Sequence, residues 1–228
     1  MTEQEWLVCN DPEAMLALLK KREKGSDRKF WLFVVAAWRH SERALDLRDV
    51  MSSLERRADL GHSPSTVRHD ERDASLRGSS TFADLLLSTS AVIAAELCCV
   101  YNPGTDWKLM KLDGRGFPLE RTSEEEDAAY ETAIVTDKGK SAALLRELFG
   151  CLPFRSLTTA QGWIAWNGGT IPALATAIYD EQTFDRMPIL ADALEDAGCD
   201  NRDILDHCRG PGPHVRGCWV LDLLLGKE

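Results

Sequence analysis

Residues 188–226 read PILADALEDAGCDNRDILDHCRGPGPHVRGCWVLDLLLG, and this stretch decides the fold class. Pro188 begins a helix whose apolar residues recur at the spacing of one helix face, and Gly198 ends it. Asp200 is the expected N-cap of a second helix. A third helix ends at Gly226, and its apolar residues are Val215, Trp219, Leu223 and Leu224. Three short helices with connections of a few residues are typical of antiparallel helical packing.

Similar capping residues and helix-ending glycines predict further helices towards the N-terminus. Asn10 or Asp11 can cap a helix that ends by Gly25, and a second helix is predicted over 27–38. Ser141 is expected to cap a helix that closes at Gly150. The sequence therefore favours helices over strands along most of its length.

The middle of the chain is less regular. Residues 42–60 continue the helical pattern, and residues 81–101 are apolar around nearly the whole helix circumference, which predicts a central core helix. In residues 105–121, apolar residues alternate with polar ones around Asp113-Gly114, which indicates a small hairpin or an ordered loop. We predict an all-α, compact antiparallel array of helices in one domain, 1–228, with N-terminal helices at 1–64, a variable linker or central segment at 65–140, and C-terminal helices at 141–228.

Charge is distributed unevenly along the 228 residues. Residues 1–78 hold 14 acidic and 14 basic side chains, so the formal net charge of −10 belongs to residues 79–228. An acidic chain lacks the basic face that neutralises phosphates, which argues against general nucleic-acid binding. The excess of like charge raises solubility and biases the choice of partner.

No feature of the sequence predicts export or a membrane. The first residues lack a basic segment followed by an apolar one, so no secretory signal is expected. Asp84 and Glu96 interrupt the most apolar stretch, which favours a buried helix over a membrane span. Seven cysteines without regular spacing fit reduced thiols better than a disulfide framework. We expect a cytoplasmic protein.

The strongest candidate site is a metal site in CDNRDILDHCRGPGPHVRGC, residues 199–218. His214 and Cys218 are four residues apart, so on a helix they would share one face. His207 or Cys208 could approach across the Gly-Pro turn and complete the nitrogen and sulfur ligation that suits zinc. The alternative is that the cysteines pack in the core and no cofactor is bound, because free cysteine is among the most buried residue types.

A thiol enzyme is a further alternative for the same segment. Cys208 or Cys218 could act as a nucleophile, with His207 or His214 as its base. Asp206 or Asp222 would orient the histidine. Adjacent helical residues point about 100° apart, so His207 cannot serve Cys208 directly.

Two further pairs of residues are candidates for binding a ligand or a partner. Trp163 and Trp166 are three residues apart and could stack on a ligand, although tryptophans at this spacing are more often core. Arg209 and Arg216 flank the Gly-Pro turn and could bind an anionic partner. Asn167-Gly168-Gly169 is interpreted as a turn, with Thr170 capping the next helix.

Two regions of the chain carry a resemblance to a known family: EWLVCNDPEAML and SDRK near the start, and FDRMPILADALEDAGC and HCRGPGPHVRGCWVLDLLLGKE at the end. On these segments the chain resembles a large paralogous family of bacterial proteins to which no activity is assigned. The resemblance covers residues 3–35 and 142–228, while 65–140 correspond to a stretch that varies among members. Members often carry a cysteine-rich run where this chain reads VVAAWRH. The resemblance implies a discrete helical protein and transfers no catalytic residue.

The sequence therefore favours a helical protein that binds another protein as an adaptor or regulatory component and is not an enzyme. The alternative is a zinc-binding or thiol-dependent enzyme centred on residues 199–218. Oligomeric state is not predicted.

Overall fold

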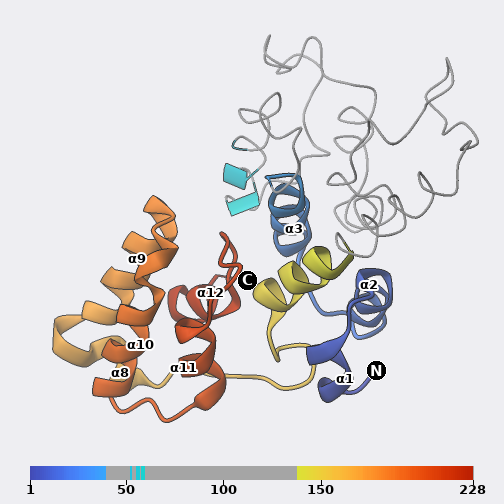
Figure 1. The fold of residues 1–228 in the computed structure, drawn as a ribbon. Coiled ribbons are helices and arrows are strands. Elements are labelled where there is room, and N and C mark those ends of the chain that lie inside the picture. Colours follow the sequence, from blue (N-terminus) through green and yellow to red (C-terminus); the bar gives the residue numbers. More distant parts are fainter. Residues whose placement is uncertain (40–51, 53–54, 57, 60–137, 228) are drawn as a thin grey trace, which may run out of the picture.

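The computed structural model describes residues 1–39, 52, 55–56, 58–59 and 138–227. These residues form helices joined by turns and contain no strand, so the all-α prediction is confirmed for them (Figure 1). A helix over 138–149 carries no label in Figure 1. The labelled α-helices are α1 (Glu3–Val8), α2 (Pro12–Lys21), α3 (Asp27–Arg39), α8 (Gln161–Ala165), α9 (Thr170–Glu181), α10 (Met187–Asp196), α11 (Arg202–Arg209) and α12 (Trp219–Leu225).

The N-terminal helices begin where the capping residues predict. The Asp11 side chain accepts from the backbone N–H groups of Glu13 and Ala14, and Pro12 is the first residue of α2. The short helix α1 was not predicted, although Thr2 and Glu5 form a capping box at its start.

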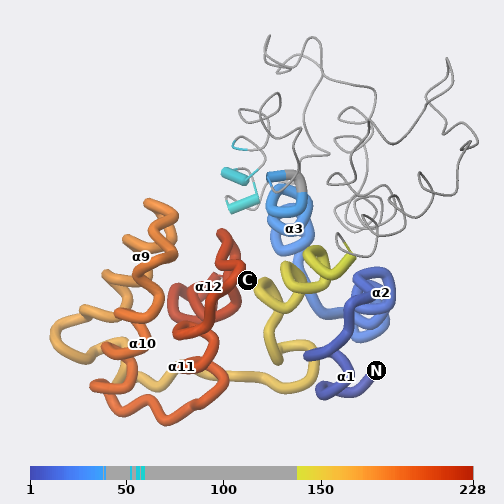
Figure 2. Tube along the Cα trace, in the orientation of Figure 1, coloured from blue at the N-terminus to red at the C-terminus, as the bar shows by residue number. Residues whose placement is uncertain are grey.

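The described helices bury two hydrophobic clusters. One lies among α1, α2, α3 and helix 138–149, and includes Trp6, Leu16 and Phe33. The other lies among α9 to α12 and includes Tyr179 and Leu190. Figure 2 shows α12 between the two groups of helices, so its residues can reach both.

Buried ion pairs connect α3 to α12. The guanidinium of Arg28 donates to both carboxylate oxygens of Asp222, over 2.8 and 3.0 Å, and Lys29 pairs with the same carboxylate. Lys29 Nζ also donates to the carbonyl groups of Leu148 and Gly217. These contacts fix the backbone just before α12.

Several predicted helix starts are wrong by one or more residues. Ser141 lies inside helix 138–149 rather than at its start. Gly169 precedes α9, and the Thr170 hydroxyl instead donates to the Asn167 carbonyl. The cap of α11 is Asn201 rather than Asp200, because the Asn201 side chain accepts from the N–H of Asp203.

Other sequence predictions lie wholly or mostly outside the described residues. They are the helices at 42–60 and 81–101, the linker or central segment, and the hairpin or loop at 105–121. Residues 52, 55–56 and 58–59 of the first of these are helical. Among the described helices, none combines the length and the apolar character needed to cross a bilayer.

Candidate metal centre

Four potential metal ligands meet in what we call the Glu147 cluster, which consists of Glu147, His207, His214 and Cys218. One ligand atom from each side chain lies within 4.8 Å of those of the other three. Glu147 comes from helix 138–149, His207 from α11, and Cys218 is the residue before α12. His214 lies in the connection between α11 and α12. Residues from three parts of the fold thus converge on one point.

The glycines of the connection place His214 and Cys218. Gly212 has a φ of +86°, and a Cβ at this position would lie 2.5 Å from the backbone nitrogen of His214. Gly217 has a φ of +89°, and its Cβ would lie 2.7 Å from Leu32 Cδ1. Residues with a Cβ rarely adopt this backbone conformation and would also clash. The sequence RGPGPHVRGC therefore turns tightly where other residues could not.

Glu147 is the centre of the cluster. Its side chain is 3% exposed, and its Oε1 lies 3.2 Å from Nδ1 of His214 while its Oε2 lies 3.4 Å from Nε2 of His207. Burial works to raise the pKa of Glu147, but hydrogen bonds from the two histidines outweigh it and lower the pKa. Glu147 is therefore a buried carboxylate that carries its charge.

His214 has an acceptor at each ring nitrogen. Nε2 lies 3.2 Å from the Gly210 carbonyl oxygen, and Nδ1 faces Glu147. Burial works to lower the pKa of His214, but the hydrogen bond and charge of Glu147, together with the Gly210 carbonyl, raise it. The Gly210 contact leaves Nδ1 as the nitrogen that can face a metal ion.

Cys218 closes the buried side of the cluster. Its side chain is inaccessible to solvent, and its Sγ lies 3.1 Å from Nε2 of His207. Burial and the nearby Glu147 charge raise the pKa of this thiol well above its usual value. A thiol in this state is a poor nucleophile, since the thiolate is the reactive form.

Trp219 fixes the proton on His207. The indole Nε1–H donates to Nδ1 of His207 over 3.1 Å. Because the indole nitrogen can only donate, Nδ1 must be the acceptor of the imidazole, and the ring proton lies on Nε2. Nε2–H then points at Cys218 and Glu147, so His207 cannot take the thiol proton as a base.

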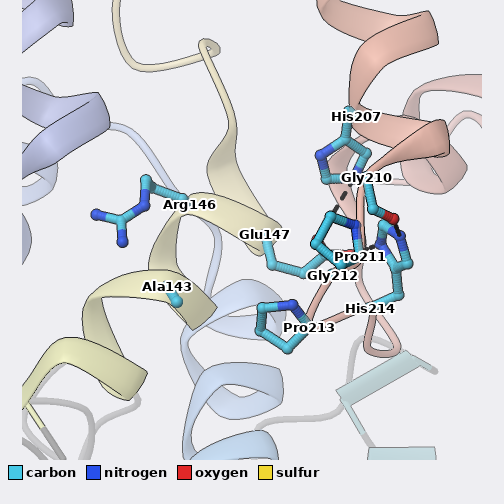
Figure 3. A pocket seen from close by; sticks show the side chains of 9 residues that line it. All are labelled: Ala143, Arg146, Glu147, His207, Gly210, Pro211, Gly212, Pro213 and His214. Atoms are coloured by element: carbon cyan, nitrogen blue, oxygen red, sulfur yellow. Dashed lines mark hydrogen bonds and ion pairs between the residues drawn. The ribbon is translucent and has the colours of Figure 1, made fainter. Parts of the chain in front are cut away.

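A pocket of about 270 Å³ opens beside the cluster (Figure 3). Glu147, His207 and His214 line it, together with Ala143, Arg146 and the Gly210–Pro213 turn. Figure 3 shows both imidazoles and the Glu147 side chain on the side formed by the turn, with the Arg146 guanidinium directed away from them. Cys218 does not line the pocket and is fully buried.

The structure brings together three of the four residues predicted as metal ligands. His207, His214 and Cys218 meet. The prediction that His214 and Cys218 share one helix face was wrong, because α12 begins only at Trp219. Cys208 is not in the Glu147 cluster. Like Cys218, it is buried in the hydrophobic cluster among α9 to α12, which we call the C-terminal hydrophobic cluster, and burial raises the pKa of its thiol to about 12. Cys199 is in the same cluster.

Sequence reasoning missed Glu147. It stands in LLRELFG, three residues after Leu144 and next to Leu148, both of which are buried. A charged residue on the buried face of a helix needs a partner. That position was the available signal, but its partners lie about 60 residues away and cannot be read from local spacing.

The remaining candidates occupy other places. Asp222 pairs with Arg28 and Lys29, so it does not orient a histidine of the cluster. Trp163 and Trp166 are half-buried against the C-terminal hydrophobic cluster. Arg209 pairs with Asp192 and Glu195, and Arg216 lies near Glu55 and Asp59.

Comparisons with protein-family models, curated proteins and solved structures found no match to this chain. The family resemblance of its N- and C-terminal segments stays a prediction.

Proposed function

We propose that the protein binds a divalent transition-metal ion in the Glu147 cluster, and that zinc is the ion the donor set suits best. The observation that carries the proposal is the convergence of carboxylate, imidazole and thiol atoms, all within 4.8 Å of one another. Ligand atoms about 2.0–2.3 Å from a tetrahedral zinc ion lie about 3.3–3.7 Å apart. The contact of 3.2 Å between Glu147 Oε1 and His214 Nδ1 is close to this spacing.

The mixture of donors selects among metals. Calcium and magnesium prefer sites made of oxygen ligands, whereas the cluster has one carboxylate and three nitrogen or sulfur side chains. Imidazole and thiolate favour zinc and its neighbours in the first transition row. Binding would also remove the proton from the Cys218 thiol, because a thiol ligates as the thiolate.

A nucleophilic thiol is less well supported at this position. The Cys218 thiol has a raised pKa, and the Nε2–H of His207 faces it as a donor. The cluster therefore lacks a base for the thiol, whereas a metal ion would itself displace the thiol proton.

Metal binding can be tested on full-length protein without an affinity tag, stripped with a chelator and titrated with zinc in a calorimeter. We expect one equivalent to bind. Replacing a ligand in Cys218→Ser or His214→Ala should weaken binding by more than the ~10–100-fold that loss of an outer hydrogen-bond partner costs. Less than about a tenth of an equivalent in the unmodified chain would contradict the proposal.

Cys208→Ser is the matched control. Cys208 is as buried as Cys218 but stands outside the cluster. This variant should keep the stoichiometry and affinity of the unmodified chain. Equal loss in both cysteine variants would indicate a general folding defect in place of a lost ligand.

The adaptor role expected from the sequence stays a prediction. Among the described residues, the large apolar side chains that stand exposed include Leu7, Val8 and Ile189. Leu7 and Val8 lie on α1 and Ile189 on α10, so they belong to different groups of helices. Isolated exposed apolar residues are ordinary on monomeric proteins and do not define a partner.

A further inference from the structure

We infer that the metal is held by three protein ligands, Glu147, His214 and Cys218, and that His207 donates a hydrogen bond to a small anion bound to the metal from the pocket. This inference rests on the proposed metal site and assigns the roles within it. It also names a ligand class for the pocket of about 270 Å³, which is a carboxylate or a similar small oxygen-bearing anion.

The two histidines of the cluster differ in what lies behind them. A histidine that ligates a metal through one ring nitrogen almost always donates its other N–H to an acceptor. His214 satisfies this condition, because its Nε2 faces the Gly210 carbonyl at 3.2 Å and Nδ1 faces the cluster. Its ring is already oriented as a ligand.

His207 does not satisfy the condition. The nitrogen behind it, Nδ1, faces the N–H of Trp219 at 3.1 Å, and an indole N–H cannot accept. Ligation through Nε2 would require a proton on Nδ1, directed at another N–H group. The Nε2 nitrogen therefore keeps its proton and serves as a donor, 3.1 Å from Cys218 Sγ and 3.4 Å from Glu147 Oε2.

Trp219 is itself held in place. Its side chain is 3% exposed, and its ring packs so closely on Gly150 that a Cβ there would lie 2.6 Å from the indole. The His207 and Trp219 rings are also in contact, with centroids 5.2 Å apart. The indole cannot easily turn away to release Nδ1.

Three protein ligands leave one position of a four-coordinate zinc ion for an outside ligand. Cys218 is fully buried and does not line the pocket, whereas Glu147, His207 and His214 do, so we place that position on the side of the pocket. The Gly210–Pro213 turn supplies an uncharged wall, and the Arg146 guanidinium is directed away from the cluster and donates to the Cys9 carbonyl. The Glu147 carboxylate and the Cys218 thiolate together balance the two charges of the ion. A small anion would therefore be held by the open metal position and by the hydrogen bond from Nε2–H of His207.

The test uses full-length protein loaded with Co²⁺, whose visible absorption reports its ligands, and acetate as the probe. The unmodified chain should bind one equivalent of Co²⁺, and acetate should change the spectrum to saturation. His207→Ala should still bind one equivalent, while its acetate affinity falls about tenfold or more, as expected for a lost hydrogen bond to a charged group. His207→Gln retains an N–H donor and should recover part of that affinity.

The possible failures are distinguishable. If His207→Ala loses Co²⁺ as His214→Ala does, His207 is a ligand and this inference is overturned, while metal binding stands. If the unmodified chain binds Co²⁺ but acetate does not change the spectrum, no coordination position is open to the pocket and this inference is overturned. If the unmodified chain binds no metal, the proposed function fails and this inference with it. Should His207→Ala not fold, Trp219→Phe tests whether the indole N–H keeps His207 from ligating the metal. Without that N–H, Nδ1 can carry the ring proton and His207 can compete with acetate for the metal, so the acetate affinity should fall.

Discussion

Glu147 Oε1 and His214 Nδ1 lie 3.2 Å apart, although 67 residues separate them in the chain. Both side chains are buried, at 3% and 8% exposure. The pair joins helix 138–149 to the connection before α12, and therefore ties the two hydrophobic clusters together at the pocket. When His214 is protonated the contact is a hydrogen-bonded ion pair, so pH should affect both folding and metal binding through it.

The first prediction concerns the stability of the metal-free protein. The pKa of His214 is raised above 6.5, so its favourable contribution is complete below pH 6.5 and is lost as pH rises through the folded pKa. The pKa of Glu147 is lowered below 4.5, so its contribution is complete above pH 4.5 and is lost as pH falls through the folded value. The pair should stabilise the fold most between pH 4.5 and 6.5.

Urea unfolding with chelator present measures this dependence. Glu147→Gln should lower the free energy of unfolding at pH 6 by about 1.5–3 kcal/mol, the usual contribution of a hydrogen bond to a charged group. The same substitution should also reduce the decrease in the free energy of unfolding between pH 6 and 8. An unchanged decline in Glu147→Gln would show that other groups cause it.

The second prediction concerns the protons released when zinc binds. Cys218 must lose its thiol proton and His214 must lose the proton on Nδ1, and the pKa of each group is raised. Zinc should therefore release about two protons at pH 6, and the apparent affinity should rise with pH. Calorimetry in two buffers of different ionisation enthalpy measures the number. Cys218→Ser, compared at zinc concentrations that still give binding, should release about one proton fewer.

The helices could be predicted from the sequence because their signals are local. Asp11 and Pro12 start α2, Pro188 stands in the first turn of α10, and Gly226 ends α12, each within a few residues of the pattern that predicts it. Helix starts failed where two adjacent residues could cap, as with Asp200 and Asn201. Side-chain competition of that kind depends on the path of the preceding chain.

The candidate site was predicted only in part, for a physical reason. The segment 199–218 concentrates cysteine and histidine, which is visible locally. Cys208 and Cys218 cannot be distinguished by spacing, because a positive φ at Gly217 breaks the helix that the spacing assumes. Glu147 enters through packing between distant helices, and such contacts have no local signature.

The third prediction concerns the ion pairs between α3 and α12. Asp222→Asn leaves the charges of Arg28 and Lys29 buried beside a neutral amide. Loss of one partner of a buried pair costs about 3–5 kcal/mol. Denaturant unfolding should show a decrease of that order. Since Lys29 also holds the Gly217 carbonyl, 2.7 Å from Nζ, zinc affinity should fall as well.

Asp192→Asn is the control for that prediction. Asp192 pairs with Arg209, but its side chain is 72% exposed. Exposed ion pairs contribute about 0–1 kcal/mol, so this variant should unfold almost as the unmodified chain does. Similar losses in both variants would mean that net charge, and not the buried contact, determines the effect.

The fourth prediction separates backbone strain from the geometry of the site. Gly212 and Gly198 both have a φ of +86°, but a Cβ on Gly212 would lie 2.5 Å from the His214 nitrogen, whereas a Cβ on Gly198 meets nothing within 4 Å. Each substitution by alanine forces an L-residue into the left-handed region and should cost about 1–3 kcal/mol of stability. The added clash at Gly212 must also displace His214, whose Nδ1 is a proposed ligand. Gly212→Ala should therefore weaken zinc binding by more than about tenfold, while Gly198→Ala keeps the affinity of the unmodified chain. Zinc titration of both variants, at a temperature where unfolding curves show each to be folded, makes the comparison. Equal affinities would show that the turn does not position His214 for the metal.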